Sequence, residues 1–469
     1  MIRQPGQPRV GVLAVTLELY ETLSPGLRAE REQWLRSGVL PVLATMADVR
    51  FTRAVFRRED VETAVAEYGA EGCDALVVIY LTYAPSQILL SALQRTRLPI
   101  LVWNTQELWA VDATYDGERV GQNHGVHGTQ DLANVLLRSD VPFHYVTCHV
   151  NDRGGLAELA DFLTAAAAVA GLRRCRLGLL GYAFPGMGDF AVDSTHLVAT
   201  LGCSWEPLPL QEFNKRAASA DGQAVEQLTA EYRRLYDVAS DVTEGDLDLT
   251  ARAELSLRAM AADRHLDALS FQFLALGEDE QTATLPFVAV SRMMADGFGF
   301  AGEGDLVGAA GSWLLNRLCP PASFSEIFTI DFAGNGVLLS HMGEANAAMA
   351  RSDRKIPLVA RPVPITRTRG RQLALVNSFE PGPATLCALA LGPKNRWRLI
   401  VGSLDIEDFG PLATLPIPHC KLRSRDDIRS WLTAYAMAGG PHHHALCFGD
   451  TRPRLKIVAK LLDADYCEV

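Results

Sequence analysis

Apolar and polar positions follow two different periods along the first third of the chain. Continuous apolar runs are typical of strands buried on both faces of a parallel sheet, and amphipathic segments with helical spacing stand between them. The runs predict strands at 9–15, 49–56, 74–81 and 99–104, and the helical spacing predicts helices at 24–39 and 58–72. Such alternation of strands and helices predicts a doubly wound parallel sheet.

A second α/β unit begins near residue 174. The stretch RCRLGLLGYAFPGMGDF (174–190) again opens with a basic residue and an apolar strand, and a glycine-rich segment follows. The glycines do not have the GxGxxG spacing of a dinucleotide-binding turn. They therefore predict an ordinary connection from a strand to a helix.

The sequence pattern changes after about residue 320, where short strands with polar turns replace the alternating strands and helices. Gly334-Asn335-Gly336 between two apolar segments is a hairpin signal. Further short strands are predicted at 371–379, 384–392 and 396–406, and a helix at 426–440. The predicted fold is α/β, with two doubly wound, Rossmann-like parallel-sheet domains followed by an antiparallel β domain. The predicted domain ranges are 1–172, 173–320 and 321–469.

Charge and cysteine usage narrow the class of protein. The 469 residues carry a net charge of -11, which argues against a nucleic-acid or anionic-membrane partner. The N-terminal apolar run is too short for a signal peptide, and the most apolar segment, 159–172, is interrupted by Asp161 and predicts a buried helix. The nine cysteines form no CxxC pair, as expected of reduced thiols. We therefore expect a cytoplasmic protein.

One carboxylate stands at the end of an apolar segment between two glycines. In GFGFAGEGD (297–305), Gly302 and Gly304 flank Glu303 and allow the backbone to turn sharply there. A solvated turn is the simpler interpretation of this stretch. A metal site or an acid/base site is the alternative.

Three adjacent histidines follow the last predicted helix. If the segment 441–448 enters a strand, side chains alternate, so His443 faces opposite to His442 and His444. One of the three can then point into a site, although such a triplet can also be incidental.

Glu326 and His341 flank the predicted hairpin. Each is compatible with an ordinary structural role. Together with Glu303 and a histidine of the triplet, they would form a mixed oxygen and nitrogen set suited to Mn²⁺ or a similar divalent ion. Octahedral coordination would leave two positions free for adjacent oxygens of a sugar.

Four segments resemble, in order and approximate spacing, the metal-site motifs of the L-arabinose isomerase family, which is related in fold to L-fucose isomerase. They are GFGFAGEGD, SFSE, LLSHMGE and GGPHH. The resemblance extends upstream to the segments 17–23, 81–93, 99–106, 123–132 and 286–305. It therefore covers most of the chain.

This resemblance implies a role for each matching residue. The implied metal ligands are Glu303, Glu326, His341 and His443, and the two glutamates are also the candidates for the catalytic base. The implied substrate-binding residues are Tyr20, Tyr83, His127 and His442. The implied cofactor is Mn²⁺, or another divalent cation such as Co²⁺ or Mg²⁺. The family also implies a homo-oligomer, expected to be a hexamer, whose pockets share residues between subunits.

The implied activity is the isomerisation of an aldose to a ketose, in which a proton moves from C2 to C1 through a cis-enediol. We expect a pentose or deoxyhexose substrate, such as L-arabinose. Leu17, Glu18 and His124 depart from the family motifs, so the preferred sugar is open. The alternatives are a non-catalytic sugar-binding or regulatory protein, and an enzyme of the same fold that acts on another polyol or sugar acid.

Overall fold

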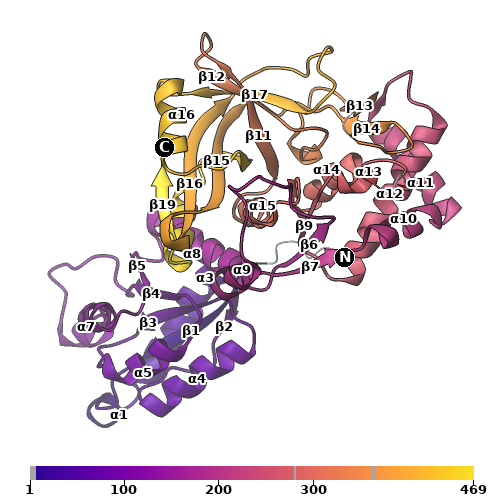
Figure 1. Ribbon diagram of the computed structural model, residues 1–469. Coiled ribbons are helices and arrows are strands. Elements are labelled where there is room, and N and C mark those ends of the chain that lie inside the picture. The colour runs from indigo at the N-terminus through magenta and orange to yellow at the C-terminus, as the bar shows by residue number, and fades with distance from the viewer. Residues whose placement is uncertain (1–6, 279–280, 362, 364–365) are drawn as a thin grey trace. The chain divides into compact units, whose positions relative to one another are not determined.

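The computed structural model describes residues 7–278, 281–361, 363 and 366–469. The chain forms two compact units, of which the first ends at Ala170 and the second begins at Gly171 (Figure 1). Parallel sheets occur in both units, and a largely antiparallel barrel occurs in the second, which confirms the predicted fold class. The three-domain division at residues 172 and 320 stays a prediction.

The first unit contains a five-stranded sheet with the order β2-β1-β3-β4-β5, in which all pairs are parallel. Its strands are β1 (Arg9–Val15), β2 (Asp48–Arg50), β3 (Ala75–Tyr80), β4 (Ile100–Asn104) and β5 (His144–Thr147). Its helices are α1 (Tyr20–Leu23), α2 (Leu27–Trp34), the π-helical η1 (Leu35–Val39), α3 (Leu40–Ala44), α4 (Arg58–Ala70), α5 (Gln87–Arg95), α6 (Gly117–Gln122) and α7 (Val126–Arg138). All six residues of β3 are buried, which explains its continuous apolar run.

Two predicted elements of this unit are shorter than expected. The strand predicted over 49–56 ends at Arg50, and Val55 makes only an isolated bridge to Val15. The helix predicted from residue 24 begins at Leu27, because Gly26 has a φ of 98° and lies outside helical geometry.

Helix α8 (Arg153–Leu172) is the most apolar helix of the described chain. Its 20 residues are long and apolar enough to cross a membrane by length and composition. Half of its most apolar window is buried in the structure. A core helix of a soluble protein passes the same test, so α8 by itself is weak evidence for a membrane span.

The second unit begins with a four-stranded parallel sheet of order β10-β9-β6-β7. Its strands are β6 (Arg176–Leu180), β7 (Ser204–Leu208), β9 (Ala268–Phe271) and β10 (Gly299–Gly302). The helices that accompany it are α9 (Ser194–Leu201), α10 (Leu210–Ala218), α11 (Gly222–Leu235), α12 (Glu244–Asp263), α13 (Ala275–Glu278), α14 (Phe287–Ala295) and α15 (Leu306–Leu318). The glycine-rich segment near residue 181 is the connection from β6 to α9.

A barrel follows in the order β15-β18-β11-β12-β17-β16, and pairing of β15 with β16 closes it. All of these pairs are antiparallel, and β19 joins β16 in parallel. The strands are β11 (Ala322–Asp331), β12 (Gly336–Ser340), β15 (Gly382–Leu391), β16 (Trp397–Ile406), β17 (His419–Ser424), β18 (His443–Phe448) and β19 (Asp465–Glu468). The remaining elements around it are η2 (Ala347–Met349), η3 (Pro393–Asn395), α16 (Ile428–Met437) and α17 (Arg452–Leu461). Closure leaves no free edge between the first and last barrel strands.

The predicted strand at 371–379 lies outside the barrel. The part of it that forms a strand, β14 (Gln372–Leu375), pairs with β13 (Pro357–Arg361). Strand β13 in turn pairs in parallel with β8 (Asp237–Val238). Helix α15 links the parallel sheet to the barrel and packs against β10, β15 and β18. The chain thus passes from the carboxyl end of β10 through α15 directly into the barrel strand β11.

Candidate functional site

Glu303 lies in the tight turn between β10 and α15, at the carboxyl end of a parallel strand. Its backbone φ is 63°, a left-handed conformation that costs free energy for a residue with a side chain. The next residue, Gly304, has a φ of 79°, and a Cβ there would lie 2.3 Å from the carbonyl oxygen of Tyr182. The turn therefore sets the direction in which the Glu303 side chain leaves the backbone.

The other residues of the site lie on three neighbouring barrel strands. Glu326 on β11 stands opposite Ser340 of β12 on one side and opposite His443 of β18 on the other. His341 is the first residue after β12. Because the registers of these strands are fixed, Glu326, His341 and His443 meet at the same rim of the barrel.

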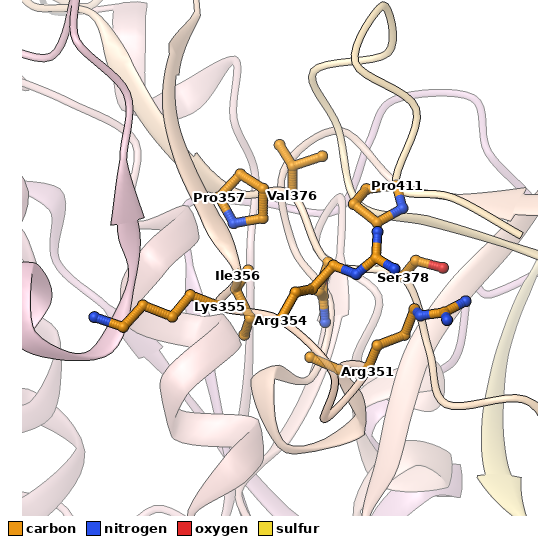
Figure 2. Close-up of a pocket in the computed structure, with 10 residues that line it drawn as sticks. Arg351, Arg354, Lys355, Ile356, Pro357, Val376, Ser378 and Pro411 are labelled. Carbon is orange, nitrogen blue, oxygen red and sulfur yellow. The ribbon is translucent and has the colours of Figure 1, made fainter.

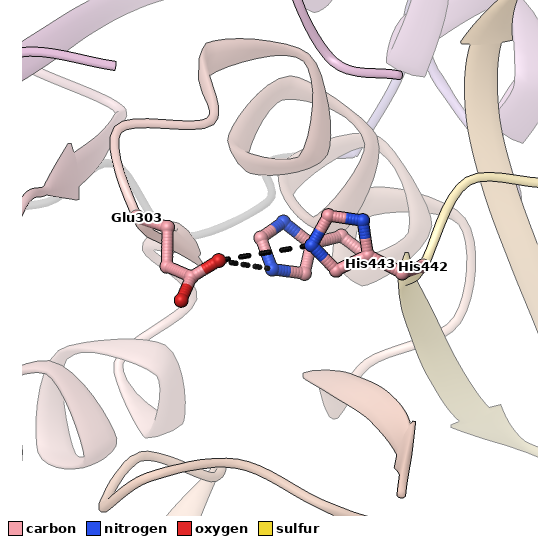
Figure 3. Close-up of side chains that lie close together, drawn as sticks. All are labelled: Glu303, His442 and His443. Carbon is pink, nitrogen blue, oxygen red and sulfur yellow. Dashed lines mark ion pairs between the residues drawn. The ribbon is translucent and has the colours of Figure 1, made fainter. Parts of the chain in front are cut away.

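The ligand atoms of these side chains converge. The Nε2 atom of His443 lies 3.5 Å from Glu303 Oε2, and the Nε2 atom of His341 lies 4.0 Å from Glu326 Oε2. Figure 3 shows His442 and His443 both directed at the Glu303 carboxylate. Within the described chain, two groups could hold a metal ion, and both include His443. They are Glu303 with His442 and His443, and Glu326 with His341 and His443.

A carboxylate holds the far nitrogen of each of the two buried histidines. Asp305 Oδ2 lies 3.0 Å from His443 Nδ1, and Glu344 Oε2 lies 2.8 Å from His341 Nδ1. Such contacts orient the rings and leave Nε2 toward the site, as the outer partners of metal-bound histidines do. The Nε2 atom of His443 is buried and has no hydrogen-bond partner. The donor set and this unpaired nitrogen fit a divalent cation.

The sequence alone assigned no role in the site to Asp305 or to Glu344, although they lie within the motifs GFGFAGEGD and LLSHMGE. Asp305 is also the N-cap of α15, since its side chain accepts a hydrogen bond from the Gly308 N–H. Glu344 stands three residues after His341, so a carboxylate near a candidate histidine was its only signal.

His442 does not face away from His443, contrary to the prediction from strand alternation. Its Nε2 atom lies 3.7 Å from Glu303 Oε2, on the same side as that of His443. The reason is that β18 begins at His443, so His442 precedes the strand and need not obey its alternation. His444 is buried, with neither ring nitrogen hydrogen-bonded, and its pKa is lowered to about 3 because burial disfavours its charged form.

The charges of the site are strongly coupled. Burial acts to raise the pKa of Glu303, but the neighbouring imidazoles of His442, His443 and His341 outweigh it and lower that pKa to about 2. Burial acts to lower the pKa of His443, but Asp305 and Glu303 outweigh it and raise that pKa to about 9. These carboxylates therefore favour the protonated form of His443 when no cation is bound. A bound cation would take the place of that proton.

An apolar floor supports the two buried histidines. The Phe324 ring lies 4.8 Å from the ring of His341 and 4.9 Å from that of His443, edge-on to both. Phe324 is on β11, two residues before Glu326, and is buried. Its packing limits the freedom of both rings and keeps water from their inner faces.

The close approach of Gly302 and His341 predicts a sharp effect of adding one methyl group. In Gly302→Ala, the new Cβ would lie 2.6 Å from His341 Cε1, which is shorter than atoms tolerate. We expect His341 to shift and the Mn²⁺ affinity to fall by at least about tenfold, as measured by calorimetric titration. Gly69→Ala is the control, because a Cβ there meets nothing within 4 Å. Unchanged Mn²⁺ binding by Gly302→Ala would contradict this account of the site.

The remaining predicted substrate residues lie in the first unit and form a cluster of their own. The hydroxyl of Tyr20 lies 2.8 Å from His124 Nε2, and the ring of Tyr83 stacks on His127 at 4.8 Å. The rings of His124 and His127 are 5.5 Å apart. Glu18, which departs from the family motif, pairs with Arg57 at 2.7 Å on the surface. The structure thus brings Tyr20, Tyr83 and His127 together, with His124 as an additional member.

A separate surface pocket in the second unit does not include any residue of this site (Figure 2). It is lined by Ala350, Arg351, Arg354, Lys355, Ile356, Pro357, Val376, Asn377, Ser378 and Pro411. Asp353 pairs with both Arg351 and Arg354, so the positive charge of the pocket is partly neutralised. The convergence of chemical groups, and not this pocket, therefore marks the candidate site.

Comparisons with known proteins agree on one family. Residues 192–318 match the family model of the L-arabinose isomerase central domain, and residues 321–465 match that of the L-arabinose isomerase C-terminal domain. L-arabinose isomerase of Nocardioides sp. is 31% identical over 80% of this chain and 76% of its own. The enzyme of Acidothermus cellulolyticus is 29% identical over the same shares, and that of Mycolicibacterium smegmatis is 28% identical over 92% of this chain and 86% of its own.

Among solved structures, the chain is similar to a periplasmic solute-binding protein of an ABC transporter from Actinobacillus succinogenes with bound D-allose. The two are 13% identical, and the match covers 69% of this chain and 95% of the other. The TM-score of 0.15 is too low to support an inference about fold or function.

Proposed function

Because the chain belongs to the L-arabinose isomerase family, it is a sugar isomerase, and we propose that it interconverts an aldose such as L-arabinose and the corresponding ketose with the aid of a divalent cation. One observation carries the proposal beyond family membership. Two carboxylates and two imidazoles from separate elements converge, and the buried Nε2 of His443 makes no hydrogen bond within the described chain.

We propose that Glu303, Glu326, His341 and His443 hold the cation, which would be Mn²⁺ or a similar ion such as Co²⁺ or Mg²⁺. Mixed carboxylate and imidazole ligands suit such ions. When bound, the cation would bind the sugar oxygens and stabilise negative charge that grows on them. Asp305 and Glu344 would keep the two imidazoles directed at it.

The two glutamates differ in how tightly the protein holds them, which bears on the choice of base. Glu303 Oε2 lies within 3.7 Å of the ring nitrogens of both His442 and His443. The Glu326 Oε2 atom lies farther from a ring nitrogen, at 4.0 Å from His341 Nε2, and the Glu326 side chain is 25% exposed. We therefore propose Glu326 as the group that takes the proton from C2 and returns it to C1 through a cis-enediol.

Further features of the proposal rest on family membership and sequence. Tyr20, Tyr83, His127 and His442 are proposed to contact the sugar. A cytoplasmic location and a homo-oligomer, with six subunits that share pocket residues, are proposed on the same basis. Enzymes of the same fold that act on another polyol or on a sugar acid are the alternatives.

The proposal predicts which sugars the protein converts and how the metal matters. Purified protein with Mn²⁺, incubated with a panel of aldopentoses and deoxyhexoses, is expected to form ketose from at least one of them. Removal of the metal with a chelator is expected to abolish ketose formation, and added Mn²⁺ is expected to restore it. Mn²⁺ binding without conversion of any sugar would favour the alternatives. Full activity in the chelated protein would exclude the metal role.

A further inference from the structure

The loop between β6 and α9 lies directly against the candidate site. The N–H of Phe184 donates to the carbonyl oxygen of Glu303 at 2.9 Å, at the strained turn. The ring of Phe190 stacks on the ring of His443 at 5.3 Å, with 5° between their planes. The loop therefore touches two proposed ligands from the outer side, although it precedes Glu303 by more than a hundred residues.

Asp189 of this loop holds His442 at two points. The same carboxylate oxygen, Oδ2, accepts the His442 backbone N–H at 3.0 Å and lies 2.5 Å from the ring nitrogen Nδ1. One contact fixes the backbone and the other fixes the rotation of the ring. A carboxylate that holds Nδ1 in this way leaves Nε2, at the other side of the ring, directed at the site.

The Nε2 atom of His442 is buried and makes no hydrogen bond to any described residue. Its one ion-pair contact there is with Glu303 Oε2, at 3.7 Å, which is too long for a hydrogen bond. A buried polar atom without a hydrogen bond is costly, and a ligand that supplies one offsets the cost. A sugar hydroxyl beside Glu303 could supply that hydrogen bond, because a hydroxyl group can both donate and accept.

His442 also differs from the two proposed ligand histidines in its exposure. Its side chain is 31% exposed, whereas the side chains of His341 and His443 are 3% and 0% exposed. The group Glu326, His341 and His443 is complete without it. A partly open ring suits contact with a substrate that enters and leaves better than permanent ligation of a cation.

On the basis of the proposed function, we propose that Asp189 is a positioning residue. It holds the His442 ring so that Nε2 binds a sugar hydroxyl, and the loop from β6 to α9 forms one wall of the sugar pocket. Asp305 and Glu344 orient the rings of His443 and His341 in the same way. Unlike Asp189, each lies close in sequence to a proposed ligand, Asp305 to Glu303 and Glu344 to His341. Asp189 reaches His442 across 253 positions.

The test measures sugar and metal separately in the full chain with Mn²⁺. Asp189→Ala is expected to raise the KM for L-arabinose, and the Kd for its non-isomerisable alditol L-arabinitol, by about tenfold to a hundredfold. The kcat and the Mn²⁺ Kd are expected to stay within about threefold of wild type, because the ligand set is intact. Asp189→Asn, whose amide oxygen can accept the same hydrogen bonds, is expected to recover most of the loss.

The control and the coupling measurement separate positioning from loss of folding. Asp193→Ala removes a carboxylate of the same loop that caps α9 through the His196 N–H at 2.8 Å, so it is expected to lower the melting temperature without raising KM. In a His442→Asn background, Asp189→Ala is expected to raise KM no further, because Asp189 acts through that ring.

Three results would overturn the inference. They are wild-type KM and Kd in Asp189→Ala, an equal rise of KM in Asp193→Ala, and an Mn²⁺ affinity that falls as far as sugar affinity does. The last result would make His442 a cation ligand. If wild-type protein neither converts L-arabinose nor binds L-arabinitol, the proposed function with this sugar fails together with the inference. Wild-type activity with an unaffected Asp189→Ala removes the inference alone.

Discussion

Replacement of Glu326 by Gln is expected to lower kcat by roughly a thousandfold, within the range that a general acid/base group contributes. The amide has nearly the same shape as the carboxylate but cannot take the C2 proton. Folding should persist, because the side chain is 25% exposed and lies 4.0 Å from the His341 ring, too far for a hydrogen bond. Turnover of the sugar found by the substrate panel, measured alongside thermal unfolding, checks both expectations.

Two comparisons sharpen this prediction. Glu380→Gln is the control, because that exposed carboxylate accepts a hydrogen bond from the Ser352 N–H outside the cluster, and turnover should be retained. Glu303→Gln should reduce turnover mainly together with Mn²⁺ affinity, since Glu303 pairs with His442 and His443. If Glu326→Gln retains full activity, the assignment of the base, and with it the site, is wrong.

Replacement of His443 by Asn is expected to cause the largest loss of metal binding among the histidine variants. His443 belongs to both groups that could hold an ion, whereas His341 and His442 each belong to one. Its loss also leaves the Asp305 carboxylate without its ring partner at 3.0 Å. We expect the Mn²⁺ affinity to fall more than about a hundredfold, beyond the cost of losing an outer partner.

The order of the three histidine variants is the decisive measurement. Calorimetric titration with Mn²⁺ should give the largest loss for His443→Asn, a smaller one for His341→Asn, and little change for His442→Asn. The circular dichroism spectrum of each variant should match that of wild type, which shows that folding is not the cause. A loss in His442→Asn that equals the loss in His443→Asn would contradict the proposed ligand set.

Local sequence patterns predicted the elements well where one physical period dominated. The run at 74–81 appears as β3, whose residues are all buried, because a strand with helices on both faces has no polar side. The hairpin at Asn335 appears with a φ of 55°, a conformation that asparagine tolerates better than most residues. Where a local signal was absent, as at the end of β2, the predicted boundary was wrong.

The sequence by itself determined the fold class, the family resemblance and the positions of Glu303, Glu326, His341 and His443 in the chain. These features can be read from the composition, from the period of the apolar residues and from the order of short motifs. None of these signals depends on contacts between distant segments. The glycines around Glu303 predicted a turn, but they did not predict that Glu303 itself adopts the left-handed conformation.

Only the tertiary structure decided how those residues meet. The register that places His443 opposite Glu326, the closure of the barrel through β15 and β16, and the direction of His442 depend on pairings between distant segments. Asp189 reaches His442 from 253 positions away. No local period encodes such a contact, because its free energy exists only once both segments have folded.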